Sequence, residues 1–168
     1  MSGVIFNAIL PILGMLVASN FCSAFGIWVM PEFLVCAIVT SVVLMLPMAS
    51  ATLSFLVVAV VADLNFSGPP GLVALLAVIL YLVIRMLMQR VQPQRVLGMA
   101  VLAFFATIVF HAALAAAYSL YYPEAALWHI FLAKSWIDAL MTAVAAPILV
   151  WVTNLFAVLF QKKKSELS

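Results

Sequence analysis

Residues 96–122 carry the sequence VLGMAVLAFFATIVFHAALAAAYSLYY, a run without a single Asp, Glu, Lys or Arg. As one helix, this run is long enough to cross the roughly 30 Å hydrocarbon core of a bilayer. A soluble domain has about 25% charged residues, whereas this chain of 168 residues has 7%, and 69% of its side chains are hydrophobic. A water-exposed surface of that composition would aggregate. We therefore expect one polytopic domain over residues 1–168, surrounded by the lipid bilayer.

Prolines, glycines and the few charged residues divide the chain into six apolar runs. They predict an all-α membrane protein with six transmembrane helices, near residues 4–28, 31–46, 48–63, 71–88, 96–122 and 136–160. The second and third runs are short for a full crossing. This pair either includes its flanking residues, thins the bilayer locally, or forms a hairpin shielded by its neighbours.

Basic residues set the expected orientation, because Lys and Arg near the ends of spans mark the cytoplasmic side. They lie between the fourth and fifth runs (Arg85, Arg90 and Arg95) and after the sixth run (Lys162, Lys163 and Lys164). An even number of crossings separates these two groups, so both belong on the same side. We expect the amino and carboxyl termini to lie in the cytoplasm.

Few side chains offer chemistry at membrane depth, where ionisable groups are costly. His111, near the middle of the fifth run, is the best candidate, because an imidazole can relay protons or contact a polar ligand; the alternative is a hydrogen bond to a neighbouring helix. Glu32, Asp63 and Asp138 fall near the expected outer boundary, so we expect no ionisable group at the depth of His111. Lys134 stands four residues before Asp138, which predicts a pair on one helix face.

Motifs of catalysis and cofactor binding do not stand out. The sequence has no Gly-x-Ser-x-Gly and no P-loop, and neither histidine has a carboxylate placed to suggest a triad. His129 has no companion at zinc-ligand spacing, and we interpret Cys22 and Cys36, inside apolar runs, as small hydrophobic residues. A net charge of +2 without a basic face argues against nucleic-acid binding. We expect no enzyme, no catalytic residue, no cofactor and no metal site.

Two local patterns predict structure rather than chemistry. The stretch DLNFSGPPG at residues 63–71 predicts an ordered turn on the outer face: Gly68 and Gly71 allow positive φ, the prolines from Pro69 fix an extended path, and Asp63 can accept hydrogen bonds from turn amides.

Small residues also recur at four-residue spacing, which lets helix backbones approach closely in lipid. The pairs are Gly14 with Ala18 and Ala113 with Ala117. We expect them to close the protein's own bundle, with contact to another membrane protein as the alternative.

The order of these features resembles the rod shape-determining MreD family over about residues 31–160. The matching positions are Pro31 and Glu32 opening a short span, Ala59 four residues before Asp63, the turn with Gly68 and Pro69 that closes on Gly71, and Pro147 in the last span. In this family these residues belong to structural or partner-binding motifs.

The resemblance implies a non-enzymatic scaffold of the bacterial cell-elongation machinery in the cytoplasmic (inner) membrane. It implies an MreC-like bitopic partner and, through it, MreB, RodA and the partner transpeptidase of RodA. The family's fold is similar to that of the S components of energy-coupling-factor vitamin transporters, so the alternative is a substrate-capturing subunit. A vitamin site needs converging polar or aromatic side chains, and the outer half offers mainly Asn20, Asn65, Tyr118 and Trp128, without a charged cluster.

Overall fold

The computed structural model describes residues 2–25, 32–64, 69–88, 96–122 and 127–165, with the side chains of 2–4, 6, 21–25, 127–132 and 160–165 left aside. The described residues form six helices and no strand, so the all-helical prediction is confirmed. The helices are α1 (Ser2–Phe25), α2 (Phe33–Val43), α3 (Met48–Leu64), α4 (Leu72–Met88), α5 (Val96–Tyr121) and α6 (Leu127–Ser165).

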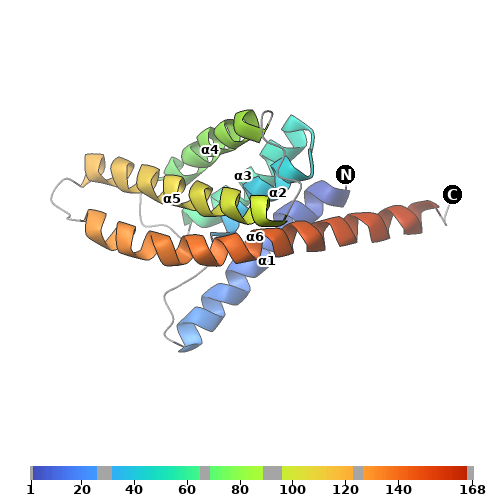
Figure 1. The fold of residues 1–168 in the computed structure, drawn as a ribbon, viewed down its shortest axis with the longest axis horizontal. Helices are drawn as coiled ribbons and strands as arrows, with labels where there is room; N and C mark the ends of the chain where they lie inside the picture. Colours follow the sequence, from blue (N-terminus) through green and yellow to red (C-terminus); the bar gives the residue numbers. More distant parts are fainter. Residues whose placement is uncertain (1, 26–31, 65–68, 89–95, 123–126, 166–168) are drawn as a thin grey trace.

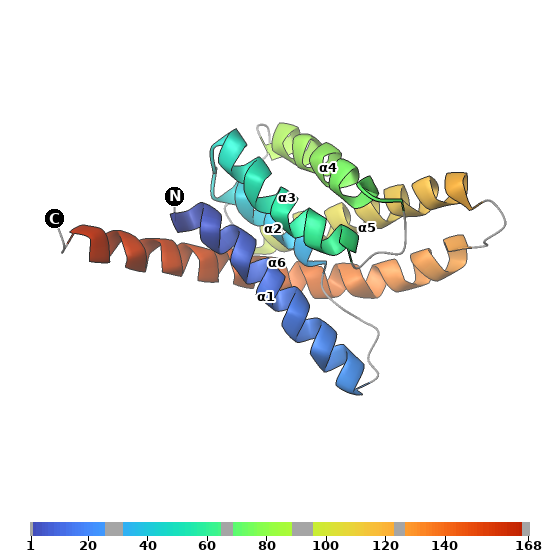
Figure 2. The same ribbon diagram turned by 180° about the vertical axis from the view of Figure 1, so that it is seen from behind.

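Helix α2 is the centre of the bundle, because it contacts each of the other five helices. It lies behind α5 and α6 in Figure 1 and behind α3 in Figure 2. Its sequence FLVCAIVTSVV is apolar on nearly all sides, and the whole stretch from Leu34 to Ser41 is buried. A helix of that kind belongs away from water, in a protein core or in lipid, and here its neighbours cover it.

Helix α2 ends at Val43 in a tight reversal. The apolar run predicts an end at residue 46. The N–H of Met45 donates to the carbonyl of Val42, and the N–H of Leu46 donates to the carbonyl of Ser41, each at 3.1 Å. These two bonds form a Schellman motif. Met45 takes the left-handed position of the motif with φ 50°, and the chain turns directly into α3.

The turn between α3 and α4 is ordered as its composition predicts. The carboxylate of Asp63 accepts a hydrogen bond from the N–H of Gly71 and a second, at 3.2 Å, from the N–H of Val73. Gly71 has φ 86°, a conformation that favours glycine. Asp63, at the end of α3, therefore caps the start of α4.

Helices α5 and α6 lie side by side and antiparallel in both ribbon views (Figures 1 and 2). Helix α6 has 39 residues, about 58 Å at 1.5 Å per residue, and extends beyond the expected 136–160 at both ends. It begins early because residues 127–135 contain no Pro or Gly to stop a helix. Pro147 lies inside α6. A proline is tolerated there when neighbouring groups satisfy the carbonyl it frees.

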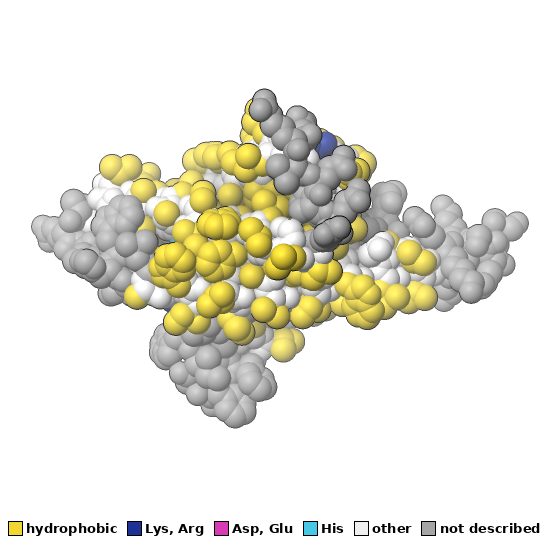
Figure 3. Space-filling view, viewed as in Figure 1, with side chains coloured by type: hydrophobic (Ala, Val, Ile, Leu, Met, Phe, Trp, Pro, Cys, Tyr) yellow, Lys and Arg dark blue, Asp and Glu magenta, His cyan; other side chains and the backbone are white. Residues whose placement is uncertain are grey.

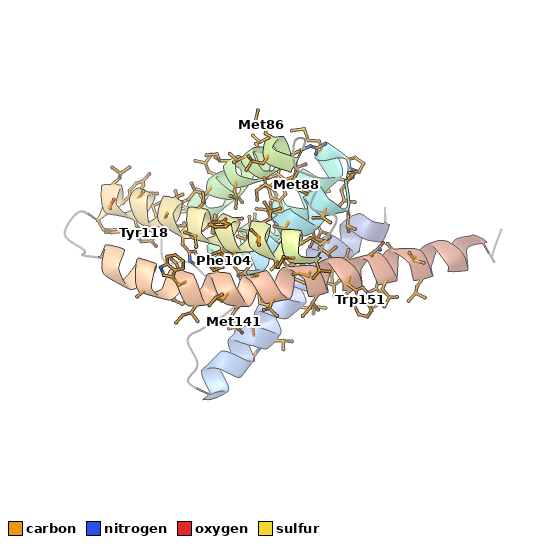
Figure 4. All side chains as sticks on the ribbon, viewed as in Figure 1. Met86, Met88, Phe104, Tyr118, Met141 and Trp151 are labelled. Atoms are coloured by element: carbon orange, nitrogen blue, oxygen red, sulfur yellow. The ribbon has the colours of Figure 1, made fainter. Side chains whose placement is uncertain are left out.

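Two segments are long and apolar enough to cross a membrane, Val96–Tyr121 and Ala133–Leu159. Within their most apolar windows only 28% and 22% of the residues are buried, so most of their side chains face outward, unlike those of a soluble protein's core helix. Hydrophobic side chains cover the face over α5 and α6 in Figure 3. Met86, Met141 and Trp151 are exposed and point away from the bundle (Figure 4).

Four further apolar segments have 10–17 residues: Asn7–Asn20, which is a stretch within the longer α1, and Phe33–Val43, Met48–Leu64 and Leu72–Met88. They enclose the core, where the ring centroids of Phe55 and Tyr81 are 4.9 Å apart and the rings are tilted against each other. Ala59 and Cys36 are fully buried in the same core. Cys36 is a free thiol, which agrees with its interpretation as a small hydrophobic residue.

Candidate functional site

A group of polar side chains gathers where α2 begins against α5 and α6. Glu32 directly precedes α2, His111 lies on α5, and Ser135 lies on α6. The Nε2 atom of His111 is 3.4 Å from Oε2 of Glu32, and its Nδ1 atom is 3.1 Å from Oγ of Ser135. We name the set of Glu32, His111, Lys134, Ser135, Asp138 and Thr142 the His111 cluster.

The backbone at the start of α2 is bound to the same cluster. The N–H of Glu32 donates to Oγ1 of Thr142 at 2.8 Å, and the hydroxyl of Thr142 donates to the carbonyl of Asp138 at 2.6 Å. The carboxylate of Glu32 also sits at the amino end of α2, where the helix dipole stabilises negative charge. Both the backbone and the side chain of Glu32 therefore fix α2 to its neighbours.

Lys134 and Asp138 form the ion pair that their spacing predicts, with Nζ 3.9 Å from Oδ2. The two ends of the pair differ in environment. The side chain of Lys134 is 51% exposed, whereas that of Asp138 is buried at 7%. Asp138 lies one helical turn after Ser135, on the side of α6 that faces the bundle, rather than at an exposed boundary.

The expectation that no ionisable group lies at the depth of His111 is wrong. His111 lies ten residues before Tyr121, the last residue of α5, and so about 15 Å from the end of that helix. Glu32 contacts His111 at this position. The physical reason is the shortness of α2: a helix of 11 residues covers only about 17 Å. Its first residue therefore lies inside the bundle rather than at the outer ends of α5 and α6.

The expectation that neither histidine has a carboxylate placed to suggest a triad is also wrong for His111, which contacts Glu32. Ser135, His111 and Glu32 form a chain of side chains with the composition of a hydrolytic triad. The arrangement does not present a nucleophile, because Ser135 is buried within a continuous helix, where backbone N–H groups bond to carbonyls of the helix itself. In the part of the chain that the structure describes, no group of three His, Cys, Asp or Glu side chains could hold a metal ion.

A second polar cluster, which the sequence analysis missed, joins α1 to α2 and α3. The Nδ2 atom of Asn7 lies 2.5 Å from Oγ of Ser41, 2.9 Å from Oγ of Ser54 and 3.3 Å from the carbonyl of Ala37. The Oδ1 atom of Asn7 is buried and has no hydrogen-bond partner among the described residues. The signal for this cluster in the sequence is a single Asn, Asn7, within an apolar run. We name Asn7, Ser41 and Ser54 the Asn7 cluster.

The motif residues of the family resemblance do not converge on one site. They are spread over the start of α2 (Glu32), the core of α3 (Ala59), the α3–α4 turn (Asp63, Pro69 and Gly71) and the interior of α6 (Pro147). Pro31 and Gly68 lie outside the described residues, as do the side chains of Cys22 and His129.

The candidate residues of a vitamin site are equally scattered. Asn20 is exposed and donates to the carbonyl of Leu16 in its own helix at 2.7 Å. The ring of Tyr118 packs against that of Tyr122, with the two ring centroids 5.7 Å apart. Asn65 and the side chain of Trp128 lie outside the described residues. Polar groups converge instead in the His111 cluster and in the Asn7 cluster, neither of which the sequence predicts.

The described residues define an all-helical protein with two helices long and apolar enough to cross a membrane and a part-buried Glu–His pair at the start of its central helix. Comparison with known proteins adds no relative: no protein-family model, no curated protein and no solved structure matches the chain.

Proposed function

We propose that the protein is a non-enzymatic scaffold of the bacterial cell-elongation machinery, embedded in the cytoplasmic membrane with six crossings and both termini in the cytoplasm. Its direct partner is an MreC-like bitopic protein, which connects it to MreB, RodA and the transpeptidase of RodA. One observation carries the proposal: the interior polar groups bond helix to helix, while the outward surface is apolar.

Polar contacts link all six helices, through two interior clusters and one cap at the α3–α4 turn. The His111 cluster joins α2, α5 and α6, the Asn7 cluster joins α1, α2 and α3, and Asp63 joins α3 to α4. Hydrogen bonds in a low-dielectric interior are strong and directional. Such a network holds the helices in one arrangement, which a protein that positions others requires.

The outward surface supplies area for lateral contacts within a bilayer. On α1 the side chains of Leu13, Leu16 and Val17 are exposed, and on α6 those of Leu140, Val144 and Ile148. Helices associate in lipid by packing such surfaces against one another. The proposed partner, a single-span protein, would bind the bundle through contacts of this kind.

Six crossings are compatible with the short helices of the bundle. Helices α3 and α4 have 17 residues each, about 26 Å, close to the hydrocarbon thickness. Helix α2 is shorter, and Glu32, the described residue that precedes it outside a helix, would lie at membrane depth. Such backbone is tolerated where protein covers it, and the contacts of Glu32 with α5 and α6 provide that cover.

The second candidate function, a substrate-capturing S component, is favoured by the His111 cluster itself. The sequence predicts no charged cluster in the outer half of the protein, and this argues against a substrate-capturing function. Glu32, His111, Lys134 and Asp138 form one. Glu32 contacts His111 and Lys134 contacts Asp138, however, and such contacts between helices or along one helix suit a structural tie better than a ligand site.

Co-purification in mild detergent distinguishes the two functions. The tagged protein is extracted from bacterial membranes and its bound components are identified, with an unrelated tagged six-span protein as the control. The scaffold proposal expects a single-span protein with a periplasmic coiled coil, absent from the control. Recovery of an ATPase module or a bound vitamin, without such a partner, would overturn it.

A further inference from the structure

We propose that one water molecule is bound inside the bundle beside α1, where it joins the side-chain amide of Asn7 to the backbone carbonyl of the same residue. The inference goes beyond the proposed function, because such a site applies equally to a scaffold and to a transporter subunit. Two independent features of α1 carry it: a buried amide atom of Asn7 without a partner, and a proline four residues later in the same helix.

The side-chain amide of Asn7 is satisfied at one end only. The side chain is almost completely buried, at 1% exposure. Its Nδ2 atom lies 2.5 Å from Oγ of Ser41 and 2.9 Å from Oγ of Ser54. The Oδ1 atom, at the other end, has no hydrogen-bond partner among the described residues. Buried polar atoms are paired in the great majority of cases, with protein or with ordered water.

Turning the amide by half a turn moves the unpaired group but does not remove it. Oδ1 would then accept from the hydroxyls of Ser41 and Ser54, which can rotate, and Nδ2 would take the unpaired position. A water molecule both donates and accepts, so it can pair with the amide atom that points away from the two serines in either orientation.

Pro11 leaves a second group of Asn7 without its regular partner. It lies inside α1 and is buried. In a helix, residue 11 donates its N–H to the carbonyl of residue 7, but proline has no N–H to donate. The carbonyl of Asn7 therefore lacks this helical bond. In membrane helices, ordered water is one of the groups that satisfy a carbonyl freed by proline.

The surroundings of Asn7 suit a water molecule better than an ion. The residues that face Asn7 from α2 and α3 are Ala37, Ser41 and Ser54. Their side chains are small and none of them is ionisable. Buried waters make about two to four hydrogen bonds, and the amide and the carbonyl of Asn7 supply the first two.

The bound water makes Pro11 compatible with a buried place in α1. It replaces the helical bond that the proline removes, and it ties this point of α1 to the side chain of Asn7. The other end of that side chain holds α1 against α2 and α3. The water thereby completes the Asn7 cluster.

The direct test is a crystal structure of the wild-type protein, grown in a lipid phase, at a resolution that shows ordered water. We expect one water within about 3.2 Å of both the carbonyl oxygen of Asn7 and the amide atom that points away from Ser41 and Ser54. A water in contact with only one of these atoms, or with neither, would overturn the proposal.

A second measurement looks for the water in a lipid bilayer. Solid-state NMR follows the transfer of magnetisation from water protons to the side-chain nitrogen of labelled asparagine, and the loss of a signal in Asn7→Ala assigns it to Asn7. We expect transfer to Asn7 in the wild type despite its burial. Absence of this transfer would count against the bound water.

The Pro11→Ala variant separates the water from the exchangeable hydroxyl protons of Ser41 and Ser54. Alanine supplies the missing N–H to the carbonyl of Asn7, so the water loses one of its two bonds and the transfer to Asn7 should fall. Pro147→Ala, which removes the proline inside α6, is the matched control and should leave the transfer at the wild-type level. Equal transfer in Pro11→Ala and the wild type would contradict the proposal. If Pro11→Ala does not fold, the wild-type crystal structure still decides.

Discussion

The ring of Phe33 lies directly against the backbone of Gly14, so closely that a methyl group at position 14 would come within 2.4 Å of Cε1 of Phe33. Phe33 is the first residue of α2, and Gly14 lies in the middle of α1. The contact shows that Gly14 helps to close the protein's own bundle, the first of the two roles considered for its small-residue motif. It also fixes where α1 crosses the start of α2.

Gly14→Ala should therefore destabilise the protein, by about 1–3 kcal/mol, as overpacking of a close contact does. Unfolding by denaturant in mixed micelles measures the change. Phe33→Leu removes the edge of the ring, so adding it to Gly14→Ala should recover part of the loss. A Gly14→Ala variant as stable as the wild type would show that the two helices do not meet at this point.

Removal of the Asp63 carboxylate should loosen the start of α4. We expect Asp63→Ala to cost about 1 kcal/mol, the usual effect of losing a helix cap, and Asp63→Asn to cost less because its carbonyl oxygen still accepts. The thermal unfolding midpoint of each variant tests this. Equal midpoints for Asp63→Ala and the wild type would mean that the bonds to Gly71 and Val73 contribute nothing.

Met45 occupies a left-handed position that a glycine would adopt without strain. Met45→Gly should raise the stability by about 0.5–1 kcal/mol, since non-glycine residues are penalised there. Leu44→Gly is the matched control, because Leu44 has φ −77° and a glycine there only adds freedom to the unfolded chain. If both substitutions lower the stability equally, the reversal after α2 differs from the one described.

Asn7 joins three helices, so Asn7→Ala should cost about 1–3 kcal/mol through the loss of its buried hydrogen bonds. Asn20→Ala serves as the control, because Asn20 is exposed and bonds only within α1; it should change the stability little. Denaturant unfolding of both variants gives the comparison. An equal effect of the two substitutions would argue against the Asn7 cluster.

The sequence predicted the features that depend on local chemistry. Six helices follow from apolar runs punctuated by Pro, Gly and charge, and the cap formed by Asp63 follows from the composition of its turn. The pair of Lys134 and Asp138 follows from helical spacing alone. Each of these requires knowledge of only a few neighbouring residues.

The features that the sequence analysis missed depend on how helices pack. The sequence predicts Glu32 at the outer boundary, whereas α2 is short and begins inside the bundle. The contact of Glu32 with His111 joins residues 79 positions apart, and that of Asn7 with Ser54 joins residues 47 apart. Periodicity and composition carry no information about pairs at such separations.

The most direct test of the account is the coupling between Glu32 and His111, since this pair fixes the central helix to its neighbours. Glu32→Gln, His111→Gln and the double variant are unfolded under identical conditions at neutral pH, with Asp63→Asn replacing Glu32→Gln in a control cycle. We predict a coupling energy of about 1 kcal/mol or more for Glu32 with His111, and none for His111 with Asp63, whose carboxylate bonds to the α3–α4 turn. Additive effects of Glu32→Gln and His111→Gln, within about 0.3–0.5 kcal/mol, would contradict the account.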